Sequence, residues 1–282
     1  DIAEVSVIAA LNLAYQTVAK RHGYPLDENG RRCSLDHLAF VVAGYGKLGG
    51  IELGYGSDLD LVFIHAMDEQ ADTDGTKVIS GFEFAMRVAQ KFMSLMTTQT
   101  LDGRVYEIDT RLRPSGEAGL LVTSLKAFEQ YQLKSAWVWE HQALVRARSI
   151  AGELSLREKF EQLRCRILTL PRDEENVRVE VLNMRQKMKD HLGSSKEQKK
   201  DGIFHLKQDA GGIVDIEFMA QYMVLAWSGT NQDLAHYSDN VRILEDAGKA
   251  GCLPSSDVTA LIQAYLSERA ESHRLALANH NM

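Results

Sequence analysis

The spacing of apolar and polar residues predicts helices and short strands in the first part of the chain. Residues 79–98 carry apolar side chains at every third or fourth position, the spacing of an amphipathic helix. Residues 2–21 are rich in Ala, Val, Ile and Leu and predict a second helix. Short apolar, β-branched runs predict strands at residues 38–43, 58–65 and 104–109. The predicted apolar face of the helix over 79–98 comprises Phe82, Ala85, Met86, Ala89, Met93 and Met96.

After Pro114 the pattern becomes helical throughout. The predicted helices cover residues 124–133, 137–150, 153–168, a long segment after Pro171, and residues 212–227, 238–249 and 255–278. Residues 193–202 are polar and predict an exposed loop. The expected fold class is therefore α+β, with one module over residues 1–150 and an all-α helical module over residues 151–282.

Composition and charge narrow the classes of function. The chain has 282 residues, 45% of them hydrophobic, and a formal net charge of −7, which argues against a general nucleic-acid binder. We find no apolar run as long as a membrane span and no signal peptide, so we expect no membrane partner. Cys33, Cys165 and Cys252 are isolated, which predicts a reducing compartment and a cytoplasmic location. Because the chain opens on Asp1, we expect a piece of a longer protein.

Two acidic residues at the start of the predicted strand over 58–65 indicate which class of reaction the chain could support. Asp58 and Asp60 are two residues apart, and residues i and i+2 of a strand point to the same face. Adjacent carboxylates repel each other, so one pKa must rise or a cation must lie between them. Mg²⁺ prefers carboxylate oxygens together with substrate phosphates. The pattern therefore predicts a metal-dependent phosphoryl or nucleotidyl transfer site.

A third acid is expected to complete that site. Asp109 ends the strand over 104–109, and two metal ions need more ligands than two carboxylates supply. If the extended geometry persists, Asp109, Arg111 and Arg113 share one face, where the guanidinium groups could contact phosphate. The alternatives are that Asp109 is a turn residue and that the arginines form ion pairs with nearby aspartates.

A glycine-rich stretch precedes the two acids. Gly44, Gly46 and Gly49 match the G-x-G-x-x-G pattern of dinucleotide-binding folds, but too few residues remain before Asp58 for a crossover helix. We favour a strand–turn–strand whose backbone approaches a triphosphate. Lys47 and Ser57 could contact the same phosphates, or they could be a solvated surface lysine and a turn serine.

Two further clusters favour structural roles. Asp215 and Glu217 lie in the first turn of a predicted helix, where acids complement the helix dipole. They make a poor metal pair, because positions i and i+2 on a helix do not face each other. Arg146 and Arg148 fall near the end of the predicted helix over 137–150, where core packing and helix surface explain them better than substrate contact.

Longer motifs resemble a known family. The matching segments are Val42-Ala43-Gly44-Tyr45-Gly46-Lys47-Leu48-Gly49-Gly50, Ser57-Asp58-Leu59-Asp60-Leu61, Asp109-Thr110-Arg111-Leu112-Arg113-Pro114, Trp139-Glu140-His141-Gln142 and Gly211-Gly212 with Asp215-Ile216-Glu217-Phe218. They resemble bacterial glutamine synthetase adenylyltransferases, whose nucleotidyltransferase fold is shared with DNA polymerase beta. The resemblance runs from about residue 38 to at least residue 250.

The resemblance implies a nucleotidyltransferase fold, a small mixed β-sheet with flanking helices, followed by a helical domain. It implies that ATP and two Mg²⁺ ions transfer AMP to a tyrosine of glutamine synthetase. Asp58 and Asp60 would bind both ions, and Asp109 would complete one ion's ligands and help remove the tyrosine proton. Gly44, Gly46, Lys47, Gly49, Ser57, Arg111 and Arg113 would contact the nucleotide.

The family has two homologous halves, and the motifs resemble the C-terminal, adenylylating half more closely, through Glu52-Leu53-Gly54-Tyr55 and Trp139-Glu140-His141-Gln142. The other half removes AMP by phosphorolysis and gives ADP, and this alternative stays open. A third reading is a non-catalytic module that docks glutamine synthetase or the family's PII signalling protein. PII is an expected partner, and glutamine is a candidate small-molecule effector.

Overall fold

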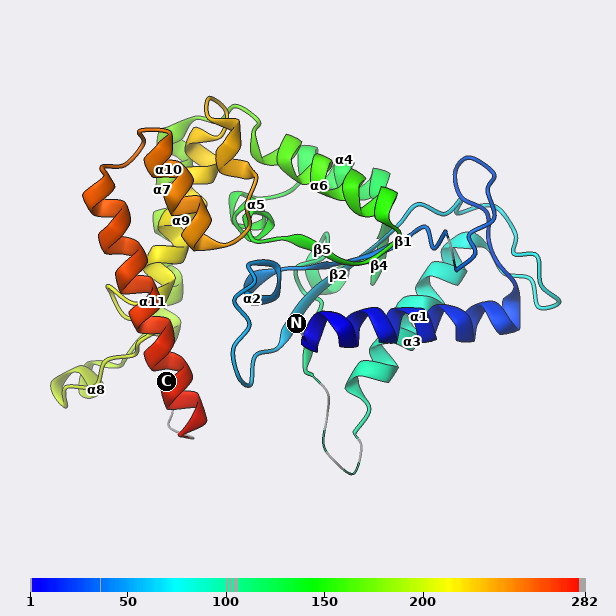
Figure 1. The fold of residues 1–282 in the computed structure, drawn as a ribbon, viewed down its shortest axis with the longest axis horizontal. Coiled ribbons are helices and arrows are strands. Elements are labelled where there is room, and N and C mark those ends of the chain that lie inside the picture. Colours follow the sequence, from blue (N-terminus) through cyan, green and yellow to red (C-terminus); the bar gives the residue numbers. More distant parts are fainter. Residues whose placement is uncertain (1, 36, 100, 102, 104–105, 279–282) are drawn as a thin grey trace. The chain divides into compact units, whose positions relative to one another are not determined.

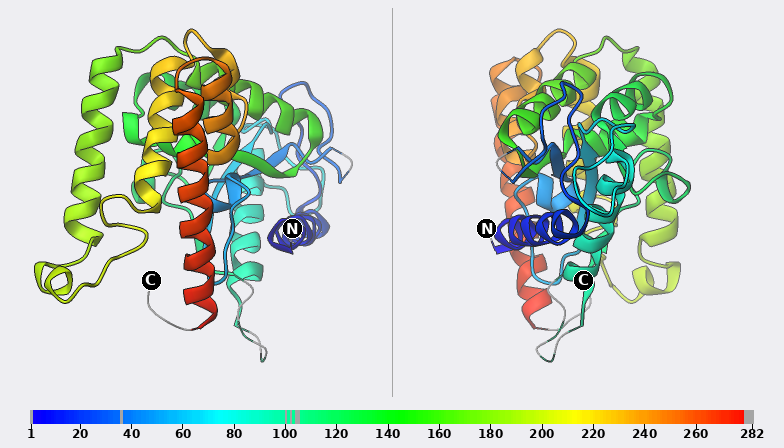
Figure 2. Two further views of the ribbon diagram at one scale, coloured as in Figure 1. Left: turned by 60° about the vertical axis from the view of Figure 1, so that its left-hand side comes forward. Right: turned by 90° about the vertical axis from the view of Figure 1, so that its right-hand side faces the viewer.

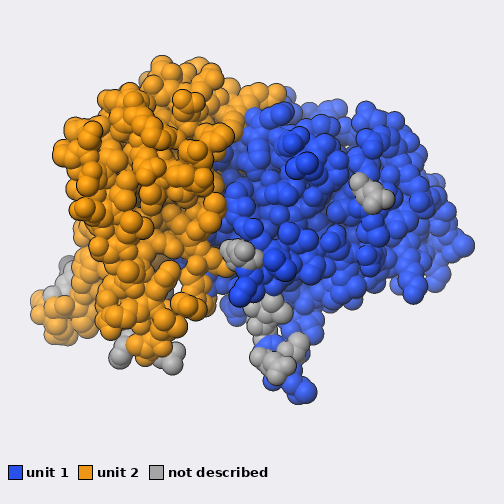
Figure 3. All heavy atoms as spheres, viewed as in Figure 1, with its two compact units in different colours: residues 1–49, 57–136, 147–164 blue, residues 50–56, 137–146, 165–282 orange. Residues whose placement is uncertain are grey.

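The computed structural model describes residues 2–35, 37–99, 101, 103 and 106–278 (Figure 1). Its contacts divide the chain into two compact units that alternate along the sequence (Figure 3). Unit 1 comprises residues 1–49, 57–136 and 147–164, and unit 2 comprises residues 50–56, 137–146 and 165–282. The predicted α+β class is confirmed, with a small mixed sheet and flanking helices followed by a helical part. The predicted division into modules near residue 150 stays a prediction.

Unit 1 is built on a mixed sheet that has five strands within the described residues. The strands are β1 (Phe40–Gly44), β2 (Leu59–His65), β3 (Ile108–Asp109), β4 (Val122–Ser124) and β5 (Arg148–Gly152). β1 pairs antiparallel with both β2 and β5, whereas β3 and β4 pair parallel with β2. The strand order is β3-β2-β1-β5, and β4 pairs with β2 beside this path.

Helices cover both faces of this sheet, which explains the unbroken apolar run in β2. Figure 1 shows α1 (Ile2–His22) and α3 (Gly81–Thr97) along one face and α4 (Leu125–Lys134) along the other. Phe63 of β2 lies 5.2 Å from Phe92 of α3 between ring centroids, in an edge-to-face contact. β2 is buried at every position except Asp60, so the strand that carries this acid is held rigidly.

The predicted helix over 79–98 is confirmed as α3, but its buried face is rotated from the predicted one. Ser80 caps the helix by accepting a hydrogen bond from the Glu83 amide at 3.2 Å. Phe82 and Met93 of the predicted face are half-buried, whereas Phe84 is fully buried. Apolar residues occupy both stripes, so tertiary packing decides which stripe faces the sheet. The buried apolar residues of α3 are Phe84, Ala85, Val88, Ala89, Phe92 and Met96.

Helix α1 is apolar and long enough to cross a membrane by length and composition, contrary to the expectation from the sequence. Its buried residues include Val7, Leu11 and Tyr15, and the helix packs against α3 and β5. Figures 1 and 2 show α1 lying beside α3 in each view. Packing inside unit 1 accounts for this buried face of α1, whereas Ile2, Val5 and Leu13 of the same helix are exposed.

Unit 2 is helical. Its helices are α5 (Val138–Val145), α7 (Glu174–Leu192), α8 (Lys196–Lys200), α9 (Ile213–Trp227), the short 3₁₀ helix η2 (Gln232–Ala235), α10 (Asn240–Lys249) and α11 (Ser255–Leu277). Helix α6 (Leu154–Leu168) begins in unit 1 and ends in unit 2. The apolar helix α9 packs against α5, α7, α10 and α11, and Figure 2 shows α11 running alongside α9 and α10.

The structure differs from the predicted elements over residues 104–109, 137–150 and 193–202. The predicted helix over 137–150 ends at Val145, and residues 148–152 form β5 because they pair with β1, a partner that local periodicity cannot reveal. Of the predicted strand over 104–109, only Ile108 and Asp109 are extended and paired, while residues 104–105 lie outside the described residues. The predicted loop over 193–202 contains the short helix α8.

His65 makes unit 1 sensitive to acid. The side chain is fully buried at the end of β2, and its Nδ1 accepts the Met67 amide at 3.2 Å. Burial lowers the pKa of His65 to about 4, although Glu69 at 3.6 Å partly opposes this shift. Below the ordinary pKa of about 6.5, the unfolded chain takes up a proton that the folded chain refuses.

We therefore predict that the free energy of unfolding falls as the pH drops from about 6.5 to 4, by roughly 3 kcal/mol from this residue. His65→Asn keeps an acceptor near the position of Nδ1 but does not titrate. Urea unfolding at a series of pH values should show a shallower acid loss for this variant. Equal slopes for both proteins would contradict the assignment of the acid sensitivity to His65.

Candidate active site

Strand pairing brings together the three aspartates that the sequence singles out. In the parallel register of β2 and β3, Asp60 is the direct partner of Asp109, and the Leu59 amide donates to the Glu107 carbonyl at 2.8 Å. Asp58 lies two residues before Asp60, just outside β2. One carboxylate oxygen from each aspartate can be chosen so that all three lie within 4.8 Å of one another. The predicted convergence is present, while the role of these residues as metal ligands stays a prediction.

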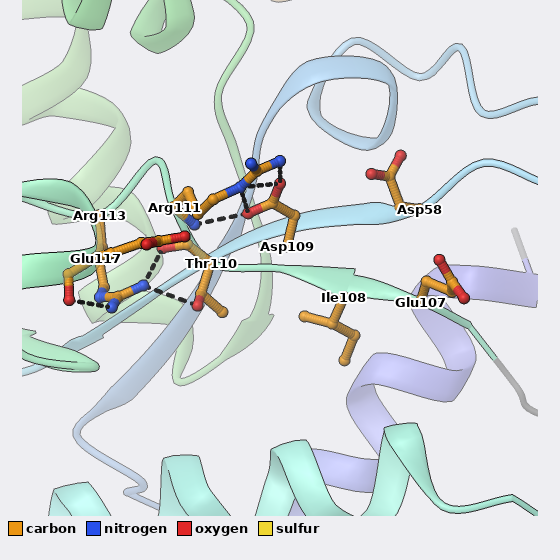
Figure 4. A pocket seen from close by; sticks show the side chains of 8 residues that line it. All are labelled: Asp58, Glu107, Ile108, Asp109, Thr110, Arg111, Arg113 and Glu117. Carbon is orange, nitrogen blue, oxygen red and sulfur yellow. Dashed lines mark hydrogen bonds and ion pairs between the residues drawn. The ribbon is translucent and has the colours of Figure 1, made fainter.

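Asp58 and Asp109 line an open pocket of about 490 Å³. Figure 4 shows the side chains of Asp58 and Asp109 projecting to the same side of the strands. Two acids that sequence reasoning missed, Glu107 and Glu117, also line this pocket. Glu107 could have been found, because it stands two residues before Asp109 and alternation places both on one face. Glu117 reaches the pocket because the chain turns after Asp109, and a turn has no periodic sequence pattern from which this position could be predicted.

The glycine turn packs directly against the carboxylate of Asp60. Gly44 ends β1, and the short helix α2 (Gly46–Gly49) follows, where the sequence predicts a simple turn. This helix has four residues, so the fully described segment between β1 and β2 contains no crossover helix of dinucleotide-binding type. Gly46 has φ +55°, and a Cβ there would lie 2.5 Å from Oδ2 of Asp60. Only glycine permits both that backbone conformation and that approach.

Lys47 and Ser57 are neighbours beside this turn. The Lys47 ammonium donates to the Ser57 hydroxyl at 3.4 Å, although ten residues separate them. Ser57 adjoins Asp58 in the chain, and Lys47 lies in α2 next to Gly46. The structure therefore brings a cation and a hydroxyl together beside the glycine turn, and both groups can contact phosphate.

The guanidinium of Arg111 forms an ion pair with the carboxylate of Asp109. Its guanidinium Nε lies 2.8 Å from Oδ2 and 3.0 Å from Oδ1, and the Arg111 amide donates to Oδ1 at 2.8 Å. These hydrogen bonds to Arg111 lower the pKa of Asp109 and outweigh the effect of its partial burial. The Arg111 side chain is 68% exposed, so it can leave Asp109 without unpacking a core.

Arg113 does not join the same face, and the expectation that Asp109, Arg111 and Arg113 share one face is wrong. The extended backbone ends at Asp109, and a turn begins at Thr110. The Arg113 guanidinium instead donates to the carbonyls of Thr110 at 2.8 Å and Glu117 at 3.1 Å (Figure 4). It also donates to the Gly119 carbonyl at 3.2 Å. It holds the turn together, and contact with phosphate stays a prediction that this geometry does not favour.

The donor set fits a hard divalent cation. Asp58, Asp60 and Asp109 supply carboxylate oxygens, which Mg²⁺ prefers, and the carboxylates repel one another unless a cation lies between them. The single guanidinium of Arg111 compensates only part of that charge. The nearby lysine, serine and glycine backbone suit the phosphates with which Mg²⁺ is commonly bound.

Comparison with known proteins assigns the chain to a family. A family model described as glutamate-ammonia ligase adenylyltransferase matches residues 1–163, more than half of the chain. The chain belongs to this family. A second model, described as GlnD PII-uridylyltransferase, matches residues 182–281 in the helical part.

Two relatives illustrate the membership. The chain is 83% identical over its whole length to a protein of Acinetobacter baylyi named bifunctional glutamine synthetase adenylyltransferase/adenylyl-removing enzyme. It is 51% identical, over 98% of its length, to a protein of the same name from Pseudomonas aeruginosa. The chain spans about 30% of the length of these relatives.

The contact between Gly46 and Asp60 generates a prediction. Gly46→Ala should push the Asp60 carboxylate aside and raise the dissociation constant for Mn²⁺ by about tenfold, which corresponds to about 1.4 kcal/mol. Gly30→Ala is the matched control, because Gly30 also has a positive φ of +76° but a Cβ there meets nothing within 4 Å. Electron paramagnetic resonance titration with Mn²⁺ measures both. Equal affinities in the two variants would contradict a role for the close approach.

Proposed function

We propose that this chain carries a nucleotidyl-transfer site that moves AMP from ATP to a tyrosine hydroxyl of glutamine synthetase. The observation that supports this most directly is the convergence of Asp58, Asp60 and Asp109, from neighbouring strands, within 4.8 Å. Family membership supports the same class of reaction. The pocket beside the aspartates is open, as a site that must admit a protein side chain requires.

The three aspartates would hold two Mg²⁺ ions, and bound Mg²⁺ would stabilise the charge of the reacting phosphates and make the tyrosine proton easier to remove. In the reaction, the tyrosine oxygen forms a bond to the α-phosphorus while the bond to the departing pyrophosphate breaks. The tyrosine proton passes to the carboxylate of Asp109. That carboxylate is a weak base while Arg111 holds it, so Arg111 must release Asp109 before the transfer.

The other residues of the site would position the triphosphate. Lys47 and Ser57 would contact phosphate oxygens from beside α2, and the backbone of the turn at Gly44, Gly46 and Gly49 would approach them closely. Arg111, once released from Asp109, would reach a phosphate with its exposed guanidinium. Positioning and charge stabilisation dominate this type of transfer, so each of these contacts contributes to the rate.

The same acids could serve the reverse task, the removal of AMP from glutamine synthetase by phosphate, with ADP as product. This second candidate is favoured by the bifunctional names of the relatives. Incubation of the full chain with labelled ATP and unmodified glutamine synthetase tests the first function. Incubation with adenylylated glutamine synthetase and phosphate tests the second, and the labelled product distinguishes them.

Glutamine synthetase is the protein partner in both versions, and we place the reaction in the cytoplasm. PII is a further partner in this proposal, and glutamine a candidate effector. The match of the helical part to the PII-uridylyltransferase model supports a role for residues 182–281 in this regulation. Binding of PII to the full chain, with and without glutamine, would test it.

We predict that Asp58→Asn and Asp109→Asn each lower the rate of AMP transfer by at least about 100-fold, or roughly 3 kcal/mol of transition-state stabilisation. Each substitution removes a charged ligand but keeps the shape of the side chain. The exposed Asp72, in a surface loop of unit 1, provides the control Asp72→Asn, which should leave the rate unchanged. If either site variant transferred AMP from labelled ATP at a near-normal rate, the result would contradict the proposed function.

The ion pair between Arg111 and Asp109 generates a separate prediction. Arg111→Met should bind Mn²⁺ alone several-fold more tightly, because the cation no longer competes with a guanidinium for Asp109. The same variant should bind ATP more weakly, because a phosphate contact is lost. Arg87→Met removes an exposed ion pair with Glu83 on α3 and should change neither affinity. Isothermal titration calorimetry with each ligand measures both effects, and weaker Mn²⁺ binding by Arg111→Met would contradict the competition.

A further inference from the structure

Unit 2 contains a groove between α7 and α9 that the proposed function does not use. The two helices pack side by side within unit 2 (Figure 2). The groove has a volume of about 510 Å³, which lies in the range of small-molecule sites in proteins. All of the residues that line it belong to these two helices, so the groove is complete within one unit.

The spacing of the lining residues along the two helices explains the shape of the groove. The lining positions are 178, 181, 182 and 185 on α7 and 215, 218, 219 and 222 on α9. Residues at such spacings form one stripe along a helix, and each stripe here is about 10 Å long at a rise of 1.5 Å per residue. A docked protein helix needs a larger surface, because stable interfaces bury about 800 Å² per partner. The length of the groove therefore favours a small molecule.

The walls of the groove are apolar in the middle of both stripes. Val181 and Leu182 come from α7, and Phe218 and Met219 come from α9. Leu182 is 54% exposed and Met219 is 47% exposed, whereas Val181 is buried and Phe218 is half-buried. Removal of apolar surface from water is the main driving force for binding in a concave site. These walls therefore favour a ligand with an apolar body.

One polar side chain of the groove has a hydrogen-bond donor that the fold does not use. Arg185 is only 8% exposed. Its Nε donates to Oδ1 of Asp215 at 2.5 Å, and its Nη2 donates to the Gln208 carbonyl at 2.8 Å, so the guanidinium is held in place. Its Nη1 is buried and has no hydrogen-bond partner among the described residues. A buried donor without a partner costs free energy, which a ligand that supplies an acceptor would recover.

The charges around the groove favour an acceptor without a charge. Asp215 already compensates Arg185, and at the other end of the groove Arg178 forms an ion pair with Glu175 at 2.5 Å. Glu268 of α11 adds a further carboxyl group, whose pKa is raised by burial and by the charge of Asp215. A ligand carboxylate at Arg185 would be repelled by these acids, whereas a carbonyl oxygen accepts a hydrogen bond without that repulsion.

We propose that the groove between α7 and α9 binds a small, uncharged and largely apolar molecule that carries a carbonyl group. The carbonyl oxygen accepts a hydrogen bond from Nη1 of Arg185, and the apolar body of the molecule contacts Leu182 and Met219. This inference goes beyond the proposed function and does not depend on it, because every residue that carries it belongs to unit 2 and the aspartates of the candidate active site belong to unit 1.

Three probes with the same ring skeleton test the proposal on the full chain. 1-Indanone carries a neutral carbonyl acceptor, indane-1-carboxylate carries a negative charge, and 1-aminoindane carries an ammonium group that cannot accept a hydrogen bond. Nuclear magnetic resonance of the chain with ¹³C-labelled methionine methyl groups follows Met219, whose signal is identified by its loss in Met219→Leu. The shift of this signal with probe concentration gives each dissociation constant and reports binding at the groove itself.

We expect 1-indanone to bind with a dissociation constant of about 1 mM, as is typical of so small a ligand. Both charged probes should bind at least about fivefold more weakly, because the carboxylate is repelled by Asp215 and the ammonium group leaves Nη1 of Arg185 without an acceptor. No shift of the Met219 signal with up to about 5 mM 1-indanone would overturn the proposal. Tighter binding of either charged probe would also overturn it.

A pair of substitutions on α7 tests where the probe lies. Leu182→Gln places a polar side chain in the apolar wall and should raise the dissociation constant for 1-indanone at least about fivefold. Val179→Gln is the matched control, because Val179 is also apolar and 42% exposed on α7 but does not line the groove, and it should change the constant less than about twofold. Both positions are exposed, so both variants should fold. Equal affinities in the two variants would overturn the assignment of the groove.

Discussion

The mutual repulsion of three carboxylates is the constraint on which the candidate site depends. Side chains of like charge separate unless the backbone holds them or a cation compensates them. Here the backbone holds two of the carboxylates together, because Asp60 and Asp109 are direct partners in the parallel ladder of β2 and β3. A second hydrogen bond, from the Tyr45 amide to the Asp60 carbonyl at 2.9 Å, ties the glycine turn to the same strand. Arg111 supplies part of the compensation, and a divalent cation would supply the rest.

Asp60 is held rigidly by its strand and is also approached closely by the glycine turn. β2 is buried on both faces, so Asp60 is carried by the stiffest part of the sheet, and Gly46 lets the turn lie against its carboxylate. Asp58 and Arg111 are less constrained by packing, because Asp58 is exposed and precedes the strand and Arg111 is largely exposed. The site thus combines a fixed ligand with residues whose positions can respond to metal and nucleotide.

Unit 2 contains a buried polar cluster around Glu52 that shows a different use of buried charge. Its other members are Arg146, Glu217, Asn240, Tyr265 and Arg269. A buried ion pair contributes little net stability, because desolvation offsets the attraction, but its geometry is demanding. Hydrogen bonds from Tyr265, Asn240 and Arg146 hold the carboxylate of Glu52 in one position within unit 2.

The sequence by itself determined the features that depend on neighbouring residues. Period-two alternation placed Asp58 and Asp60 on one face, apolar periodicity predicted α1, α3 and most later helices, and the spacing before Asp58 excluded a crossover helix. Only the tertiary structure decided the features that depend on distant partners. Residues 148–152 became a strand because β1 lies beside them, and the turn after Asp109 sent Arg113 to backbone carbonyls.

The clearest case is Glu52, which meets Arg146 after 94 residues and Tyr265 after 213. Neither Glu217 nor Arg146 could be recognised as part of a buried cluster, and helix-dipole and surface roles were the better local explanations. The physical reason is that backbone propensity and side-chain periodicity act over a few residues. Compensation of a buried charge depends on which groups the completed fold brings within hydrogen-bonding distance, and local sequence carries no record of that.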